Sequence, residues 1–114
     1  MRKGMEMIQE ILTLYSVEIR RVLGDDLRRI IVYGSYARGD YNENSDIDIM
    51  VLTSLPEQEI ELAEDKLYDA AFDFLMEYGV NISVIVKNEE HFIYWLGALP
   101  FYDNVEREGV VISG

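Results

Sequence analysis

Two aspartates spaced two residues apart, Asp46 and Asp48, are the side chains of this sequence best suited to chemistry. They lead into an apolar run, 49–52, which predicts a strand. Side chains alternate faces along a strand, so the two carboxylates should point the same way. Neighbouring carboxylates repel each other unless a cation lies between them. A hard ion such as Mg²⁺ takes oxygen ligands and usually keeps substrate phosphates, so the pair predicts a metal site.

A Gly-Ser pair, Gly34 and Ser35, lies about ten residues before the aspartates and directly after the apolar run 30–33. This order predicts a strand, a tight turn and a short helical start. The first backbone N–H groups of a helix lack partners and can bind an anion. Gly34 would let the backbone approach phosphates, and Ser35 could also serve as a helix cap. Together with the aspartates, the turn predicts a binding site for a nucleoside triphosphate and its metal.

The string Gly-Ser-x-Ala-Arg-Gly followed by Ser-Asp-x-Asp resembles the signature of the DNA polymerase β-type nucleotidyltransferase superfamily. Its extended form is similar to the minimal nucleotidyltransferase (MNT) proteins. The resemblance covers roughly residues 28–87 and implies a nucleotidyltransferase core, Mg²⁺ and ATP as substrate. It also implies a HEPN-domain toxin as partner, with the MNT protein as antitoxin. Nucleotide contacts are expected from Gly34, Ser35, Arg38 and Ser45, and metal binding and catalysis from Asp46 and Asp48.

One position departs from the pattern of that superfamily. Catalytic members carry a third carboxylate on a strand beside Asp-x-Asp, whereas here the matching positions are Asn81 or Ser83. Glu89 and Glu90 follow that strand and are expected to lie too far along. Two carboxylates can hold a nucleotide-bound Mg²⁺, but the third helps to hold the second metal that activates the attacking hydroxyl. The sequence therefore predicts nucleotide binding and leaves two-metal catalysis open.

Length and composition limit the class of protein. The 114 residues predict one domain spanning 1–114, and no apolar run approaches the ~20 residues that span a bilayer. The start has no long apolar stretch of the kind found in signal peptides, and the absence of cysteine excludes disulfides and thiolate zinc sites. A cytoplasmic location is expected. The net charge of −12 disfavours nucleic acid and favours a basic protein partner.

The other helices and strands are predicted from the periodicity of apolar residues and from helix-breaking residues. An amphipathic helix is predicted over about 5–23, ended by Gly24, and a second over about 56–78, ended by Gly79. The exposed side of the second helix is strongly acidic, which suits either a solubilising surface or a face that attracts a cationic partner. A strand is predicted over 80–86.

Shorter elements complete the chain. Asn88 is expected to cap a short aromatic helix, and residues 101–108 and 109–113 are expected to form a last turn or helix and a terminal strand. The order of elements predicts an α/β (α+β) fold, a nucleotidyltransferase-like mixed β-sheet with helices packed on one face.

Three functions are compatible with these patterns. The first is transfer of AMP from Mg-ATP to a hydroxyl of a protein acceptor. The second is a nucleotide- or toxin-binding module that neutralises a HEPN partner by forming a complex. The third, a small-molecule modifier like the aminoglycoside nucleotidyltransferases, ranks last because 114 residues leave little room for an additional helical domain. Self-association into a homo-oligomer is left open.

Overall fold

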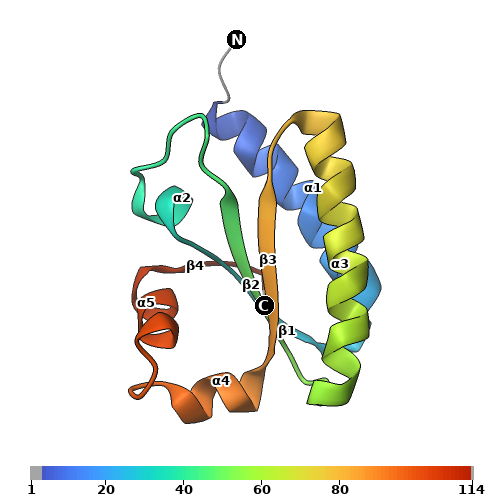
Figure 1. Cartoon of the computed structure of the whole chain (residues 1–114), viewed down its shortest axis with the longest axis vertical. Coiled ribbons are helices and arrows are strands. Elements are labelled where there is room, and N and C mark those ends of the chain that lie inside the picture. The colour runs from blue at the N-terminus through green and yellow to red at the C-terminus, as the bar shows by residue number, and fades with distance from the viewer. Residues whose placement is uncertain (1–3, 114) are drawn as a thin grey trace.

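A computed structural model describes residues 4–113 of the chain. Helices and strands alternate along it, with two long helices and several short ones (Figure 1). In chain order the elements are α1 (Met5–Leu23), η1 (Gly24–Asp26), β1 (Leu27–Tyr33), α2 (Ser35–Arg38), β2 (Ile47–Thr53), α3 (Glu57–Tyr78), β3 (Ile82–Asn88), α4 (Glu89–Trp95), α5 (Pro100–Glu108) and β4 (Val110–Ser113).

The four strands form one mixed sheet in the order β3-β2-β1-β4. β1 is antiparallel to both β2 and β4, whereas β2 and β3 run parallel, joined by the long crossover through α3. In this register Tyr33 pairs with Asp48, and Asp48 pairs with Ser83 on the other side. The sheet therefore brings the end of β1, the start of β2 and the start of β3 to one place.

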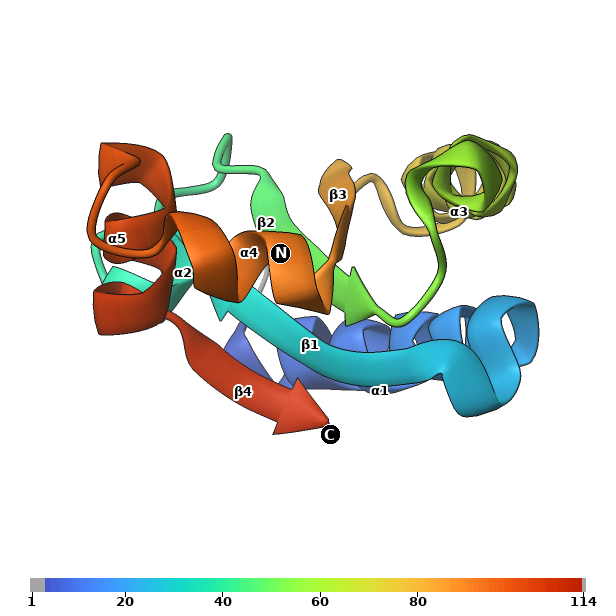
Figure 2. The same ribbon diagram turned by 90° about the horizontal axis from the view of Figure 1, so that it is seen from below.

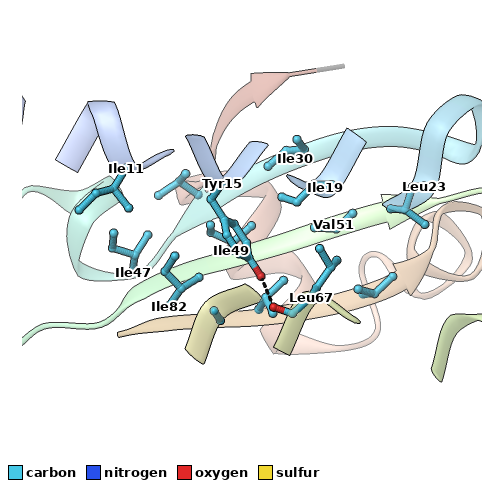
Figure 3. Close-up of a cluster of buried hydrophobic side chains, with 14 of the residues drawn as sticks. Ile11, Tyr15, Ile19, Leu23, Ile30, Ile47, Ile49, Val51, Leu67 and Ile82 are labelled. Atoms are coloured by element: carbon cyan, nitrogen blue, oxygen red, sulfur yellow. Dashed lines mark hydrogen bonds between the residues drawn. The ribbon is translucent and has the colours of Figure 1, made fainter. Parts of the chain in front are cut away.

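The main core lies between the sheet and the two long helices. Ile47, Ile49 and Val51 of β2 point into it, as alternation along a strand requires. Tyr15 of α1 is fully buried there, and its hydroxyl donates a 2.7 Å hydrogen bond to the carbonyl of Leu67 in α3 (Figure 3). This bond fastens the two helices to each other inside the core.

A second, smaller core lies on the opposite face of the sheet. It combines the alternate strand residues with α4 and α5, which Figure 2 shows on the side of the molecule away from α3. Its buried members are Ile31, Met50, Leu52, Phe92, Tyr102 and Val105. The predicted class, a mixed sheet with helices, is confirmed, and the two long helices share one face as expected. The short helices cover part of the other face because Phe92, Tyr102 and Val105 supply it with apolar side chains.

Most predicted helix boundaries are confirmed. Gly24 and Gly79 end α1 and α3 with positive φ values of 53° and 70°. Asn88 caps α4, where its side chain accepts the N–H of His91 at 3.0 Å. The helix predicted over about 56–78 begins one residue later, at Glu57, and Pro56 is its N-cap. Among the described residues, no helix combines the length and apolarity needed to cross a membrane.

Candidate functional site

Gly34 and Asp48 are packed directly against each other at the centre of the predicted site. A Cβ atom placed on Gly34 would lie 2.2 Å from Oδ2 of Asp48, which is far inside contact distance. Gly34 also has φ 74° and ψ −152°, a conformation that favours glycine. Its carbonyl accepts the N–H groups of Ala37 and Arg38 at 3.1 and 3.0 Å. Gly34 is thus the cap of α2, and Ser35, predicted as a possible cap, is its first helical residue.

Asp46 and Asp48 lie at the start of β2 and act on each other electrostatically. Asp46 is exposed immediately before the strand, while Asp48 is half-buried between the buried Ile47 and Ile49. Burial raises the pKa of Asp48, the charge of Asp46 raises it further, and the charge of Arg38 lowers it. A cation bound at Asp48 would relieve this unfavourable effect of the neighbouring carboxylate.

The loop before Asp46 is held in shape by its own side chains. Tyr41 stacks on the buried Tyr36 of α2, with ring centroids 4.5 Å apart and planes 17° apart. Ser45 accepts the N–H of Asn42 at 2.9 Å and donates its own N–H to the Asn42 carbonyl at 3.1 Å. In this structure Ser45 therefore shapes the loop that delivers Asp46, and its predicted nucleotide contact stays a prediction.

Arg38 is near the aspartates but is paired with other acids. Its Nε donates to Asp40 at 3.1 Å, and its Nη1 lies 3.4 Å from Oε1 of Glu108 at the end of α5. Both pairs raise the pKa of Arg38, with Asp40 the larger cause. An arginine in this position could turn to a phosphate only by leaving carboxylates that already accept its hydrogen bonds.

Strand β3, beside the aspartates, carries no acid at the position that pairs with Asp48. Ser83 is the residue of β3 that pairs with Asp48, and the carbonyl of Asn81 accepts the N–H of Ile47 at 2.9 Å. Glu89 lies at the far end of β3, with its carboxylate 3.7 Å from Arg29. Within residues 4–113 no group of three or more His, Cys, Asp or Glu is arranged to hold a metal ion.

The donor set fits one Mg²⁺ ion rather than two. Mg²⁺ is commonly bound by one or two carboxylates together with substrate phosphates, and Asp46 and Asp48 supply that number beside the Gly34 turn. A third carboxylate would help to hold a second catalytic metal, and Ser83 stands where the strand register would place it. The arrangement can bind a metal–polyphosphate through one carboxylate pair.

Three neighbours of the site were not expected from the sequence. Tyr33 ends β1 opposite Asp48, and burial together with the Asp48 charge raises the pKa of Tyr33 to about 12. Phe101 of α5 packs edge-on against Tyr33, with ring centroids 5.6 Å apart. Glu108 reaches Arg38 from the same helix. Alternation in 30–33 could have placed Tyr33 on this face, but no local signal joins α5 to it.

Comparison with known proteins identifies the family of the chain. Residues 16–112 match the nucleotidyltransferase domain family. The chain belongs to this nucleotidyltransferase family. It is 40% identical over 89 residues, covering 75% of this chain and 78% of the relative, to a "putative protein adenylyltransferase" of Methanocaldococcus jannaschii. The resemblance to minimal nucleotidyltransferases is confirmed.

Two solved structures share the nucleotidyltransferase fold. One is described as a "putative minimal nucleotidyltransferase", with a TM-score of 0.61, 24% identity and coverage of 95% of both chains. The other is a toxin–antitoxin with AMP-PNP, with a TM-score of 0.55, 22% identity and coverage of 89% of this chain and 72% of that one. At these identities the likeness speaks for the fold alone.

Proposed function

We propose that this nucleotidyltransferase binds Mg-ATP at Asp46 and Asp48 and transfers AMP to a hydroxyl of a protein acceptor. The observation that carries the proposal is the close approach of Gly34 to the Asp48 carboxylate, which brings the turn next to one of the two acids. The name of the relative from Methanocaldococcus jannaschii, a protein adenylyltransferase, supports a protein acceptor.

Each residue has a role in this proposal. Asp46 and Asp48 would hold the ion, and the Gly34 backbone with Ser35 would contact the β- and γ-phosphates. Arg38 and Ser45 would add further nucleotide contacts. When bound, Mg²⁺ would neutralise phosphate charge and polarise the α-phosphate. In the transfer the acceptor oxygen bonds to the α-phosphorus, the bond to the bridging oxygen breaks, and pyrophosphate leaves while the hydroxyl proton passes to solvent.

The acceptor is proposed to be a HEPN-domain toxin, with this chain as its antitoxin in the cytoplasm. The fold similarity to a toxin–antitoxin with AMP-PNP supports a pairing of this kind. The net charge of −12 supports a basic protein partner rather than nucleic acid. Residues 1–114 would form one nucleotidyltransferase domain.

A second function is favoured by one specific observation. Ser83 stands beside Asp48 where a third carboxylate would complete a two-metal site. A chain without that carboxylate could keep the nucleotide and neutralise the toxin by complex formation alone. Binding of Mg-ATP is common to both functions, and only transfer of AMP separates them.

Calorimetry with Mg-ATP tests the nucleotide site. The wild type should bind, and Asp46→Asn with Asp48→Asn should lose binding because no carboxylate remains to hold the ion. Asp65→Asn with Asp69→Asn on α3 removes the same net charge elsewhere and should bind like the wild type. Equal affinity of the wild type and the Asp46/Asp48 variant would refute the site.

A second assay separates enzyme from binding module. Labelled ATP, Mg²⁺ and the protein encoded by the adjacent reading frame are incubated with this chain. The label should appear on that protein with the wild type and not with the Asp46/Asp48 variant. Binding without labelling, repeated with Mn²⁺, would favour the module.

A further inference from the structure

Helix α3 presents a row of large apolar side chains to solvent. Tyr68, Phe72 and Met76 are spaced four residues apart, so they lie along one side of the helix. They are 47%, 59% and 66% exposed. The opposite side of α3 is buried through Ile60, Ala63, Leu67 and Ala71. We call the exposed row, together with the flanking Asp65 and Asp69, the outer face of α3.

The outer face is anchored to the rest of the fold. Glu64 accepts the backbone N–H of Val86 on β3 at 3.0 Å. Burial, the charge of Glu64 and its hydrogen bond to Tyr68 raise the pKa of that tyrosine. Glu64 thus ties the first member of the row to the edge strand. A surface held this way is preorganised for contact, which lowers the entropy cost of binding.

The charge around the row has one sign. Helix α3 carries eight acidic residues and one lysine. Lys66 lines a pocket together with Asp69 and Asp73 of α3 and with Glu18 and Arg21 of α1, so the acids outnumber the bases even there. The acids are Glu57, Glu59, Glu61, Glu64, Asp65, Asp69, Asp73 and Glu77. An apolar row within an acidic helix complements a partner that offers an apolar strip flanked by lysine or arginine.

The acidic charge of α3 also distinguishes between two possible partners for this face, a second copy of the chain and a basic protein. A second copy meeting this face would bring its own acidic α3 against the first, with a net charge of −12 on each chain. Like charges facing each other across an interface cost affinity and reject the wrong partner. A basic protein gains attraction from the acids that flank the row, Asp65 and Asp69 among them, so it is the occupant that the surface fits.

We infer that the outer face of α3 is the docking surface for a basic protein partner that offers an apolar strip, which rests on the toxin partner proposed above. Figures 1 and 2 both show α3 on the side of the molecule away from α5, whose Glu108 reaches Arg38 beside the aspartates. The partner would therefore be held by one surface while the nucleotide occupies another. Docking and nucleotide binding should be separable by mutation.

The test uses the whole chain and the purified product of the adjacent reading frame as the probe. Phe72→Ser with Met76→Ser should weaken binding of that protein about a hundredfold, because central apolar contacts dominate interface affinity. Ile93→Ser on α4, where the side chain is 54% exposed, is the matched apolar control and should bind like the wild type. Circular dichroism confirms that each variant keeps its helix content.

Charge is tested separately. Asp65→Lys with Asp69→Lys should weaken binding about tenfold at low salt, and added NaCl should weaken the wild-type complex. Glu10→Lys with Glu90→Lys makes the same change in net charge on other helices and should have a smaller effect. Asp46→Asn with Asp48→Asn should leave docking intact while abolishing Mg-ATP binding.

The outcomes separate this inference from the nucleotide proposal. Equal binding by the wild type and the Phe72/Met76 variant would overturn the docking surface while the toxin pairing stands. If the probe does not bind the wild type, the docking surface is overturned as well. Calorimetry with Mg-ATP would still test the nucleotide site at Asp46 and Asp48 independently. Dimerisation of the wild type that Phe72→Ser with Met76→Ser abolishes would assign the face to a second copy instead.

Discussion

Gly34 meets two demands at the same position. Its φ of 74° suits a residue without a side chain, and the Asp48 carboxylate occupies the space where a Cβ would stand. The first demand shapes the turn into α2. The second lets the Asp48 carboxylate approach the backbone. The turn geometry and the proposed ion site therefore both depend on the absence of a side chain at position 34.

Gly34→Ala should therefore damage binding more than it damages folding. The new Cβ would lie 2.2 Å from Asp48 Oδ2, so the carboxylate must move. We expect Mg-ATP affinity to fall at least about tenfold, and the free energy of unfolding to fall by about 1–3 kcal/mol from the positive φ and the clash. Calorimetry and urea denaturation measure the two effects.

Gly97→Ala is the matched control for that prediction. Gly97 has φ 89° and no atom within 4 Å of an added Cβ. It should show only the cost of the backbone conformation, about 1 kcal/mol, with unchanged Mg-ATP binding. If Gly34→Ala gave the same results as Gly97→Ala in both assays, the close approach of Gly34 to Asp48 would not matter for Mg-ATP binding.

At this scale the sequence pointed to candidate residues but not to their contacts in the fold. Asp46, Asp48 and Gly34 were found because their types and spacing carry the chemistry. The pairing of Arg38 with Glu108 joins residues 70 positions apart, and no local pattern encodes such a contact. Ser45 was expected to shape the loop ahead of the strand, and its hydrogen bond with Asn42 agrees, while its nucleotide contact stays a prediction.

Among the elements, the parallel pairing of β2 and β3 has the largest consequence for chemistry. It sets Ser83 beside Asp48 and keeps Glu89 at the opposite end of the strand. The position of the missing acid is thus fixed by strand register, because a shift of one residue would turn Ser83 to the other face.

Ser83→Asp should create the missing carboxylate and make stability depend on Mg²⁺. Without metal, a third acid next to Asp48, whose pKa is already raised by burial and by Asp46, should lower the free energy of unfolding by about 1–2 kcal/mol. Millimolar Mg²⁺ should restore it, because the ion neutralises the cluster. Thermal denaturation with and without Mg²⁺ measures both effects.

Ser83→Asn has nearly the same shape without the charge, so its stability should not respond to Mg²⁺ more than that of the wild type. Transfer of label from ATP to the partner is compared in parallel, and an increase only in Ser83→Asp would identify Ser83 as the limit on turnover. Equal metal-free stability of the two variants would mean that position 83 does not face Asp48.

Element boundaries were easier to predict than element positions. Gly24, Gly79 and Asn88 carry local capping chemistry, so periodicity and breakers located the helix ends. The place of β4 beside β1 follows from long-range packing. An added Cβ on Gly109 would lie 2.4 Å from Ile31 Cγ2 and from the Val105 carbonyl oxygen, and such closeness is invisible in the sequence.

In the whole molecule, stability comes from two apolar clusters on opposite faces of one sheet, in a chain with a net charge of −12. Self-repulsion at this charge opposes compaction. The larger cluster must hold the acidic α3 in place, and Tyr15 is its polar link, fully buried with its hydroxyl bonded to the Leu67 carbonyl (Figure 3).

Tyr15 should make the fold sensitive to alkaline pH. Burial, followed by the charges of Glu18 and Tyr68, raises the pKa of Tyr15 far above its usual value of 10. In the unfolded chain this phenol loses its proton near pH 10, whereas the folded protein retains it. Above pH 10 the unfolded state binds fewer protons, so the free energy of unfolding should hold below that pH and fall as the pH rises beyond it.

Tyr15→Phe separates this effect from general alkaline denaturation. The variant loses the 2.7 Å hydrogen bond to Leu67, which should cost about 1 kcal/mol at pH 7, but it has no buried phenol to ionise. Its unfolding free energy should therefore decline less steeply than that of the wild type above pH 10, and the two should converge. Tyr94→Phe, at a side chain 76% exposed, should track the wild type throughout. Urea denaturation from pH 7 to 11 measures all three, and parallel alkaline slopes for the wild type and Tyr15→Phe would show that Tyr15 does not couple protons to folding.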